Sequence, residues 1–303
     1  MRGAGQTLFA NDDGGEEAYS AYFGPIQSDG YRLADSSSGH SWNTDDVNYV
    51  GWNWKIGWVP TASNSQSAGA TPTAGSVKID GVNLGSALPG SIAAEKLTAN
   101  TTNGFSIVNY PGGAGTVAHG LGVAPKIVFQ RKYDATGDWL SYTSAINGTA
   151  DAVRLNTTSY YETADPETLA TSTVFSSLIG GNNTIAFCFA EVEGYSAIAS
   201  YTGNGSANGA FVHTGFRPAW IMIKRVDSAG FYWGIFDNKR DPVNVADAVL
   251  YANGNDTEDD SDALDMLSNG FKLRSTDNYL NNSSGTYLYL AFAESPFKYS
   301  NAR

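Results

Sequence analysis

Two stretches decide the fold that the sequence predicts, Lys126-Ile-Val-Phe-Gln-Arg-Lys132 and Ala219-Trp-Ile-Met-Ile-Lys-Arg225. Each follows an aliphatic and aromatic run, a glycine-rich turn, a histidine and a proline. These are Phe105 to Tyr110, His119 and Pro125 in the first copy, and Tyr195 to Tyr201, His213 and Pro218 in the second. Because self-similarity at a fixed spacing is typical of repeated structural units, the sequence predicts a repeat of roughly 90 to 100 residues.

The residues inside each repeat favour strands. Val, Ile, Phe, Tyr and Trp dominate runs with alternating polarity, and clusters rich in Gly and Asn separate these runs. Matching runs, Ala186 to Glu191 and Leu290 to Glu294, close the two copies. We therefore expect an all-β chain of tandem antiparallel β-sandwich modules, of jelly-roll or lectin-like type. One short helix is predicted over residues 257–267.

The organisation of the chain follows from the repeat. A partial third copy at the N-terminus contains Leu8 to Asn11, Gln27 to Leu33 and Tyr49 to Trp52, which match Leu250 to Asn253, Leu267 to Leu273 and Tyr289 to Phe292. We expect residues 1–59 to form the C-terminal half of a β module. Residues 60–103 contain a stretch rich in Ser, Thr, Gly and Ala and are predicted to be a linker. Residues 104–193 and 194–303 are predicted to be complete β-sandwich modules.

Composition excludes several classes of protein. Of 303 residues only 16% are charged, 13% are aromatic, and the formal net charge is −12. A disordered chain has few aromatics and many charges, so disorder is not expected. An acidic chain without a basic patch is not expected to bind nucleic acid, and no apolar run is long enough for a membrane helix. The single cysteine, Cys188, is interpreted as a buried apolar residue.

Four strings carry a resemblance to a known kind of protein: Gly215 to Arg225, Leu267 to Leu273, Tyr49 to Trp54, and Ala291 to Arg303. They resemble a repeat module common in virion proteins of tailed phages, especially marine ones. The resemblance implies a place on the virion surface, in a tail-fibre-like protein or capsid fibre, with other virion proteins as partners. It further implies adhesion and a homotrimer, and it supplies no catalytic residues.

Two loops contain the side chains that sugar sites use. Aromatic faces contact the C–H side of a sugar ring, while amides and carboxylates bind its hydroxyls. The loop 34–46 offers Trp42, Asn43 and Asp45, and the loop 274–285 offers Asp277, Asn278, Tyr279 and Asn281. These residues are the candidate ligand-binding set, for a host-surface glycan. The alternative is that Trp42 and Tyr279 pack on their own sheet.

The sequence predicts neither an enzyme nor a resident cofactor. It contains no nucleophile elbow and no His-Glu-x-x-His motif, and His119 and His213 recur at equivalent positions, which favours a structural role. The acidic loops 11–17 and 255–262 could bind Ca²⁺, or could be solvated loops. The leading hypothesis is an adhesion protein on a virion. The alternative is a capsid decoration or cement protein without a receptor, and the third is a glycan-degrading depolymerase.

Overall fold

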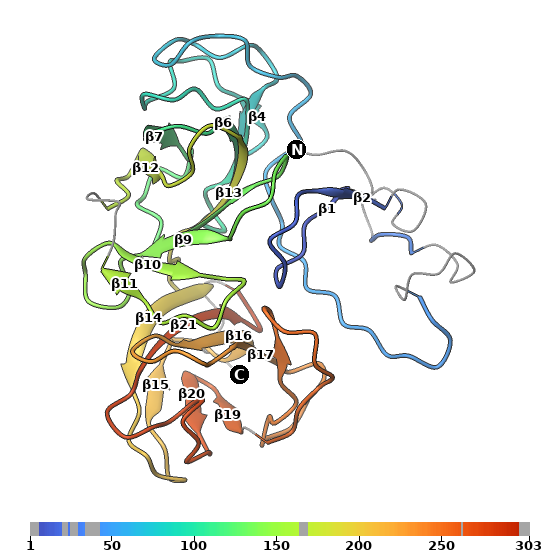
Figure 1. Ribbon diagram of the computed structural model, residues 1–303, viewed down its shortest axis with the longest axis vertical. Coiled ribbons are helices and arrows are strands. Elements are labelled where there is room, and N and C mark those ends of the chain that lie inside the picture. Colours follow the sequence, from blue (N-terminus) through green and yellow to red (C-terminus); the bar gives the residue numbers. More distant parts are fainter. Residues whose placement is uncertain are drawn as a thin grey trace.

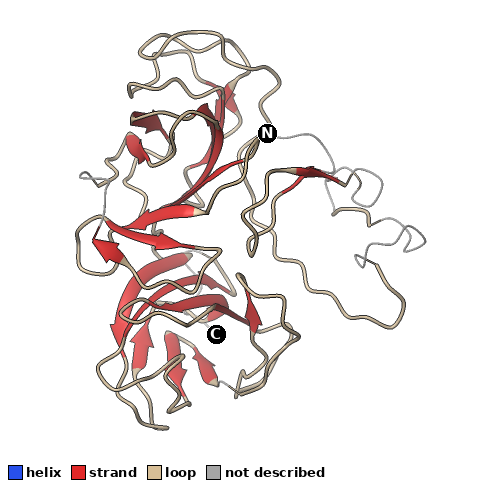
Figure 2. Cartoon of the chain, viewed as in Figure 1, coloured by secondary structure: helices blue, strands red, loops and turns tan. Residues whose placement is uncertain are grey.

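The computed structural model describes residues 6–19, 24, 30–33, 43–163, 169–261 and 263–296. Every regular element within these ranges is a β-strand (Figure 2). The predicted all-β class is therefore confirmed. The helix predicted over residues 257–267 is wrong, because Leu264–Leu267 form a strand.

The larger sheet has nine strands in the order β11-β10-β9-β8-β13-β6-β5-β3-β4 (Figure 1). Its neighbouring strands are antiparallel except for the parallel pair β3 and β5. The strands are β3 (Val77–Ile79), β4 (Val82–Asn83), β5 (Lys96–Asn100), β6 (Phe105–Pro111), β8 (Ile127–Lys132), β9 (Leu140–Thr143), β10 (Asp151–Arg154), β11 (Glu162–Thr163) and β13 (Asn183–Phe189).

A second sheet of five strands has the order β14-β21-β16-β17-β18. It contains β14 (Ser196–Thr202), β16 (Pro218–Arg225), β17 (Trp233–Asp237), β18 (Leu250–Tyr251) and β21 (Thr286–Ala293). Among the described residues, three small sheets complete the fold. They pair β1 (Gln6–Thr7) with β2 (Glu17–Ala18), β7 (Gly115–Ala118) with β12 (Val174–Ser177), and β15 (Phe211–His213) with β20 (Gly270–Leu273), which also pairs with β19 (Leu264–Leu267).

The sequence repeat has a counterpart in the sheet order. The series β10-β9-β8-β13-β6 in the nine-stranded sheet matches β18-β17-β16-β21-β14 in the five-stranded sheet. The register agrees as well, since Ile127 lies opposite Phe189 on β13 and Trp220 lies opposite Phe292 on β21. The described strands of residues 104–193 and 194–303, called the first and second unit below, therefore share one order at residues that the repeat had already aligned.

Three apolar clusters alternate with the sheets. One lies between the five-stranded sheet and the β15-β20-β19 sheet, and includes Ile223 and Phe271. Another lies between the nine-stranded sheet and the β7-β12 pair, and includes Tyr110 and Phe175. The third joins the two large sheets face to face, with Phe129 from one and Trp233 from the other. Because side chains alternate between the faces of a strand, each large sheet contributes to two of these clusters.

Residues 60–103 differ from the predicted linker. They contain β3, β4 and β5, which extend the nine-stranded sheet beyond β6. Val77, Leu97 and Ala99 are buried in its core. The linker prediction was wrong because it treated Thr and Ser as solvated residues. In the sheet their hydroxyls form hydrogen bonds within the protein; Thr98 Oγ1, for example, donates to Trp58 O.

The N-terminal segment also differs from the predicted half-module. Its described strands are β1 and β2, and residues 49–52 are not in a strand. Their repeat equivalent, β21, lies between β14 and β16, which both come from the first half of a module. Residues 1–59 contain no match to this first half of the repeat. Within the described ranges, the stretch 49–52 accordingly pairs with no strand. The segment instead packs Trp52 and Trp54 against the shared core of the two large sheets.

Candidate ligand-binding groove

An open groove of about 570 Å³ lies where the β1-β2 hairpin meets the ends of β9 and β10. Asp138 precedes β9 and Asn156 follows β10, while the other lining residues come from the hairpin. The lining consists of carboxylates, amides and aromatic rings: Phe9, Asn11, Asp12, Asp13, Glu17, Tyr19, Asp138 and Asn156.

A buried arginine fixes the hairpin in place. Arg131 on β8 has no exposed surface, and its guanidinium donates to the carbonyls of Phe9 at 2.7 Å, Asp12 at 2.6 Å and Gly14. The same guanidinium lies 5.2 Å from the ring of Trp139, whose Nε1 also donates to Phe9 O. A buried cation is costly unless its donors are satisfied. The loop carbonyls accept from both terminal nitrogens of Arg131 and so tie the groove wall to the nine-stranded sheet.

Backbone contacts add a second attachment. Glu16 N–H donates to Tyr133 O and Gly137 N–H donates to Asp13 O, both at 2.8 Å. Within the loop, Gly14 N–H donates to the Asp12 carboxylate at 2.6 Å. This hydrogen bond holds the pKa of Asp12 below its ordinary value. The Asp12 side chain is therefore ionised at neutral pH.

The opposite wall is held by its own network. Asp138 forms an ion pair with Arg154 at 3.0 Å and accepts a hydrogen bond from Asn156 Nδ2 at 2.9 Å. The amide oxygen of Asn156 accepts from Trp139 N–H at 3.0 Å. Both lining side chains are thus held in one orientation by contacts within the protein.

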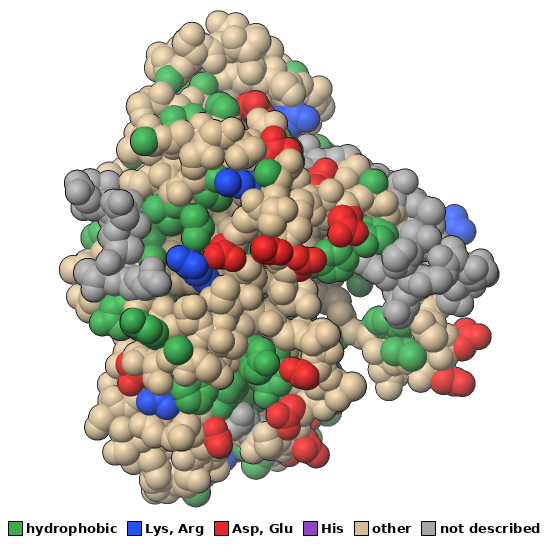
Figure 3. Space-filling model, in the orientation of Figure 1, with side chains coloured by type: hydrophobic (Ala, Val, Ile, Leu, Met, Phe, Trp, Pro, Cys, Tyr) green, Lys and Arg blue, Asp and Glu red, His purple; other side chains and the backbone are tan. Residues whose placement is uncertain are grey.

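The chemistry of the groove is acidic and aromatic. Phe9 and Tyr19 meet edge to face with ring centroids 5.9 Å apart, and the Tyr19 hydroxyl donates to the Glu17 carboxylate. Of the lining residues that the structure describes, four are acids and none is basic. Acidic side chains also gather across the middle of the face seen in Figure 3. The set suits a ligand that offers C–H faces to aromatics and hydroxyl or cationic groups to carboxylates.

The candidate residues of the first predicted loop are only partly placed. Trp42 lies outside the described residues. Asn43 and Asp45 are exposed in a turn, in which Thr44 N–H donates to the hydroxyl of Tyr49. Neither lines the groove. No described contact joins Asn43 or Asp45 to the loop 274–285, and the rest of the first loop lies outside the described residues.

In the second loop, two of the predicted site residues are exposed and two are buried. Asp277 and Asn278 are exposed. The Asp277 carboxylate accepts from Tyr279 N–H at 2.6 Å, and Asn278 O accepts from the hydroxyl of Tyr287 at 2.8 Å. These bonds shape the loop and leave the outward surface of both residues accessible.

Tyr279 and Asn281 correct the prediction of ligand contact. Tyr279 is 8% exposed and packs in the core against Phe231 and Tyr251. Asn281 is fully buried, and its amide nitrogen donates to Asn204, Ser206 and Ser275. A buried amide whose donors are used inside the protein cannot also bind a sugar hydroxyl. Asn281 instead clamps two loops, and the alternative of packing holds for Tyr279.

The sequence also predicted a structural role for the histidines and left Ca²⁺ binding open for the acidic loops. His119 is buried, with Leu121 N–H donating to its Nδ1 and its Nε2 near Thr171 O, so a structural role is confirmed there. His213 lies exposed on β15.

Within the described ranges, no three His, Cys, Asp or Glu side chains form a group that could hold a metal. Calcium binding therefore stays a prediction without a described site. Cys188 is free and buried, as interpreted.

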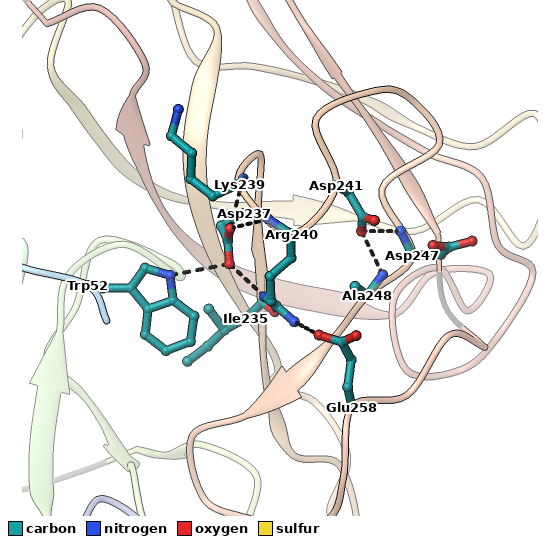
Figure 4. A network of polar contacts seen from close by, with 9 residues as sticks. All are labelled: Trp52, Ile235, Asp237, Lys239, Arg240, Asp241, Asp247, Ala248 and Glu258. Carbon is teal, nitrogen blue, oxygen red and sulfur yellow. Dashed lines mark hydrogen bonds and ion pairs between the residues drawn. The ribbon is translucent and has the colours of Figure 1, made fainter. Parts of the chain in front are cut away.

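A second network ties the N-terminal segment to the five-stranded sheet (Figure 4). Trp52 Nε1 donates to Asp237 at 3.2 Å, and Arg240 binds the same carboxylate at 2.8 Å and Glu258 at 2.9 Å. Burial alone would raise the pKa of Asp237, but hydrogen bonds from Arg240 and Lys239 outweigh it and lower the pKa. Together with Trp54, which meets Trp220 edge to face, this network holds the segment at the junction of the two large sheets.

The sequence analysis did not predict the groove, because its residues come from distant parts of the chain. The loop 11–17 was noticed only for its acids. One signal could have found the site: Arg131 stands in an apolar central strand, and a buried cation there requires a partner. Its repeat equivalent, Lys224, donates instead to Phe231 O of its own unit. This difference between the two copies marks where the N-terminal hairpin attaches.

The fold and the groove define a β-sandwich-type protein with an acidic, aromatic cleft. Residues 78–296 match the model of a family described as a domain of unknown function, DUF7483, and the chain belongs to this family. No curated protein and no solved structure matches the chain significantly. None of the described residues form a helix long and apolar enough to cross a membrane.

Proposed function

We propose that this chain is a virion surface protein, tail-fibre-like or part of a capsid fibre, that attaches to saccharides of the host surface. The groove beside β9 and β10 is the attachment site in this proposal. The place on a virion rests on the resemblance of the sequence repeat to tailed-phage modules. Binding rests on the groove, and the two parts can be tested separately.

One observation carries the binding proposal: aromatic, amide and carboxylate side chains line a single pocket. Phe9 and Tyr19 supply ring faces, Asn11 and Asn156 supply amides, and the acids supply hydroxyl acceptors. Arg131 and Trp139 hold the hairpin wall through its carbonyls. Pre-arranged walls reduce the entropy lost when a ligand binds.

The charge of the groove indicates which saccharides it selects. Its carboxylates repel uronic and sialic acids and accept hydrogen bonds from neutral or amine-bearing sugars. We expect binding to neutral or cationic host polysaccharides, and exclusion of acidic ones. Binding without cleavage is proposed, with no resident cofactor.

The test is a panel of host polysaccharides and oligosaccharides probed with the full chain. Tyr19→Ala removes a ring from the groove, and Tyr160→Ala, at an exposed tyrosine outside it, is the matched control. An aromatic contact contributes ~0.5–1.5 kcal/mol, so Tyr19→Ala should weaken binding about two- to twelvefold while Tyr160→Ala binds like the parent.

Other outcomes decide between the remaining functions. Lack of binding across the panel would favour the decoration or cement protein. Release of reducing sugar from host capsule would make the chain a depolymerase instead. Binding that Tyr19→Ala and Tyr160→Ala reduce equally would place the site outside the groove.

A further inference from the structure

Three hairpins of the chain are built alike. We call residues 7–17 the first hairpin, residues 152–162 the second and residues 249–259 the third. In each one the first residue pairs with the last in antiparallel fashion, and the loop between them has the same length in all three. The hairpins therefore recur with the sequence repeat.

The first two hairpins dock on the unit that follows them, in the same way. The first hairpin binds the turn between β8 and β9 through two backbone bonds of 2.8 Å, from Glu16 N–H and to Asp13 O. The second hairpin binds the turn between β16 and β17, where Tyr161 N–H donates to Val226 O and Gly230 N–H donates to Thr158 O, both at 2.9 Å. Each bound turn belongs to the first half of a unit, which runs from β6 to β9 or from β14 to β17.

The third hairpin presents the same two backbone groups to solvent. Glu258 N–H and Asn255 O stand at the positions through which the other hairpins dock. Neither group forms a backbone hydrogen bond with any described residue, and residues 255–258 are exposed. The third hairpin therefore has a docking site that fits the turn of a first half.

The N-terminal segment requires the same element. Residues 49–52 match residues 289–292 of β21, which lies between β14 and β16 of a first half. From Val50 to Trp54 the residues alternate between half-buried and exposed, as in a strand. None of their backbone N–H groups donates to a described residue. This stretch therefore has room for a strand on each side, within the described part of the chain.

Side-chain exposure supports the same conclusion. Tyr31 and Tyr49 are 39% and 48% exposed, whereas their repeat counterparts Phe271 and Tyr289 are 0% and 3% exposed. Both counterparts contact the ring of Tyr201 on β14. In the second unit, a first half thus helps to bury two aromatic positions that the N-terminal segment exposes.

The two open sites lie next to each other at Arg240 (Figure 4). Its guanidinium binds Glu258 of the third hairpin at 2.9 Å and lies 5.9 Å from the ring of Trp52 in the N-terminal segment. In both complete units, the strands that flank β13 or β21 and the docked turn belong to a single first half. One bound element can therefore fill both sites.

We propose that residues 50–54 and the third hairpin form one docking surface for a partner polypeptide that carries the first half of this repeat. Its strands pair with residues 50–54, a common mode of recognition, and its turn binds Glu258 N–H and Asn255 O. A second copy is not the occupant, because both first halves of this chain already hold a hairpin and a strand. The proposal goes beyond saccharide binding and does not depend on it.

Two probes test this surface: polypeptides that consist of residues 105–143 and 195–239, the two first halves present in this chain. Amide hydrogen exchange of the full chain, with and without a probe, shows where the probe binds. At least one probe should bind, slow the exchange of residues 50–54 and 255–258, and leave the docked residues 157–161 unchanged. Failure of both probes to bind, or a bound probe that leaves either segment unprotected, overturns the proposal.

Paired variants isolate the docking bonds. Glu258→Pro removes the N–H that donates to the partner, while Glu258→Ala keeps it and removes only the ion pair with Arg240. Because the partner's carbonyl is left unsatisfied, Glu258→Pro should bind a probe about fivefold or more weakly than Glu258→Ala. Asn53→Pro and Asn53→Ala make the same comparison in the strand. Equal binding within either pair contradicts the proposal.

Discussion

At the scale of single residues, His119 shows how hydrogen bonds select a protonation state. Leu121 N–H donates to Nδ1, so the ring proton of the neutral form lies on Nε2, which donates to Thr171 O. Burial lowers the pKa of His119 to about 4, below its ordinary value of 6.5. The unfolded chain therefore takes up this proton between pH 6.5 and 4 while the folded chain does not, and stability falls as the pH falls through that window.

His119→Gln should remove this contribution. At pH 7 the variant should be less stable than the parent, because it loses hydrogen bonds. When the pH falls from 7 to 4.5, however, its free energy of unfolding should fall by roughly 2–3 kcal/mol less than that of the parent. Urea unfolding at both pH values measures the difference. His213→Gln, at the exposed repeat position, is the control and should change with pH as the parent does. An identical pH response of His119→Gln and parent would refute the account of His119.

Lys224 makes the stability of the protein depend on pH in the alkaline range. It is 1% exposed, donates to Phe231 O, and burial lowers its pKa to about 8 from 10.5. The folded chain releases this proton before the unfolded chain does, so stability rises as the pH rises from 8 toward 10.5. Relative to Lys224→Met, the parent should gain about 2 kcal/mol between pH 7.5 and 9.5 in urea unfolding. A constant difference between the two proteins would show that the Lys224 pKa is not depressed.

At the scale of elements, the β1-β2 hairpin depends on one side chain of β8. Arg131→Met keeps an apolar side chain in the sheet but removes the donors to Phe9, Asp12 and Gly14. Unsatisfied polar groups cost ~1–3 kcal/mol. Amide hydrogens of residues 6–19 should therefore exchange faster, while those of β13 keep their protection. Lys132→Met, one residue along, should leave exchange in the hairpin unchanged, and equal effects of both variants would contradict the anchoring role of Arg131.

An element could be predicted when the pattern that indicates it lies within its own stretch of sequence. Strands such as β8 and β16 were predicted because alternation is local and the repeat presents it twice. The stretch 264–267 was predicted as a helix from the spacing of Ala263, Leu264 and Leu267, but pairing with β20 overrides that short pattern. Likewise, β5 was missed because what stabilises it is a sheet assembled from distant segments. Of the groove, only the acidic loop gave a local signal.

At the scale of the whole molecule, the two large sheets share one core. Phe129 and Trp233 meet across it, and Trp233 Nε1 donates to Arg154 O of the other unit at 2.8 Å. The units should therefore unfold together. Calorimetry should show a single transition with equal calorimetric and van't Hoff enthalpies. Two transitions, or two denaturant midpoints reported by different probes, would mean that the shared core does not couple the units.

The most direct test of the account is a map of where a saccharide binds. Amide hydrogen exchange of the full chain, measured with and without an oligosaccharide that the panel identifies, locates the protected segments. The groove proposal predicts new protection in residues 9–19 and 138–156, which contain the lining side chains. Protection confined to the loop around Asp277 and Asn278, or protection absent from both groove walls in a saturated complex, would contradict it.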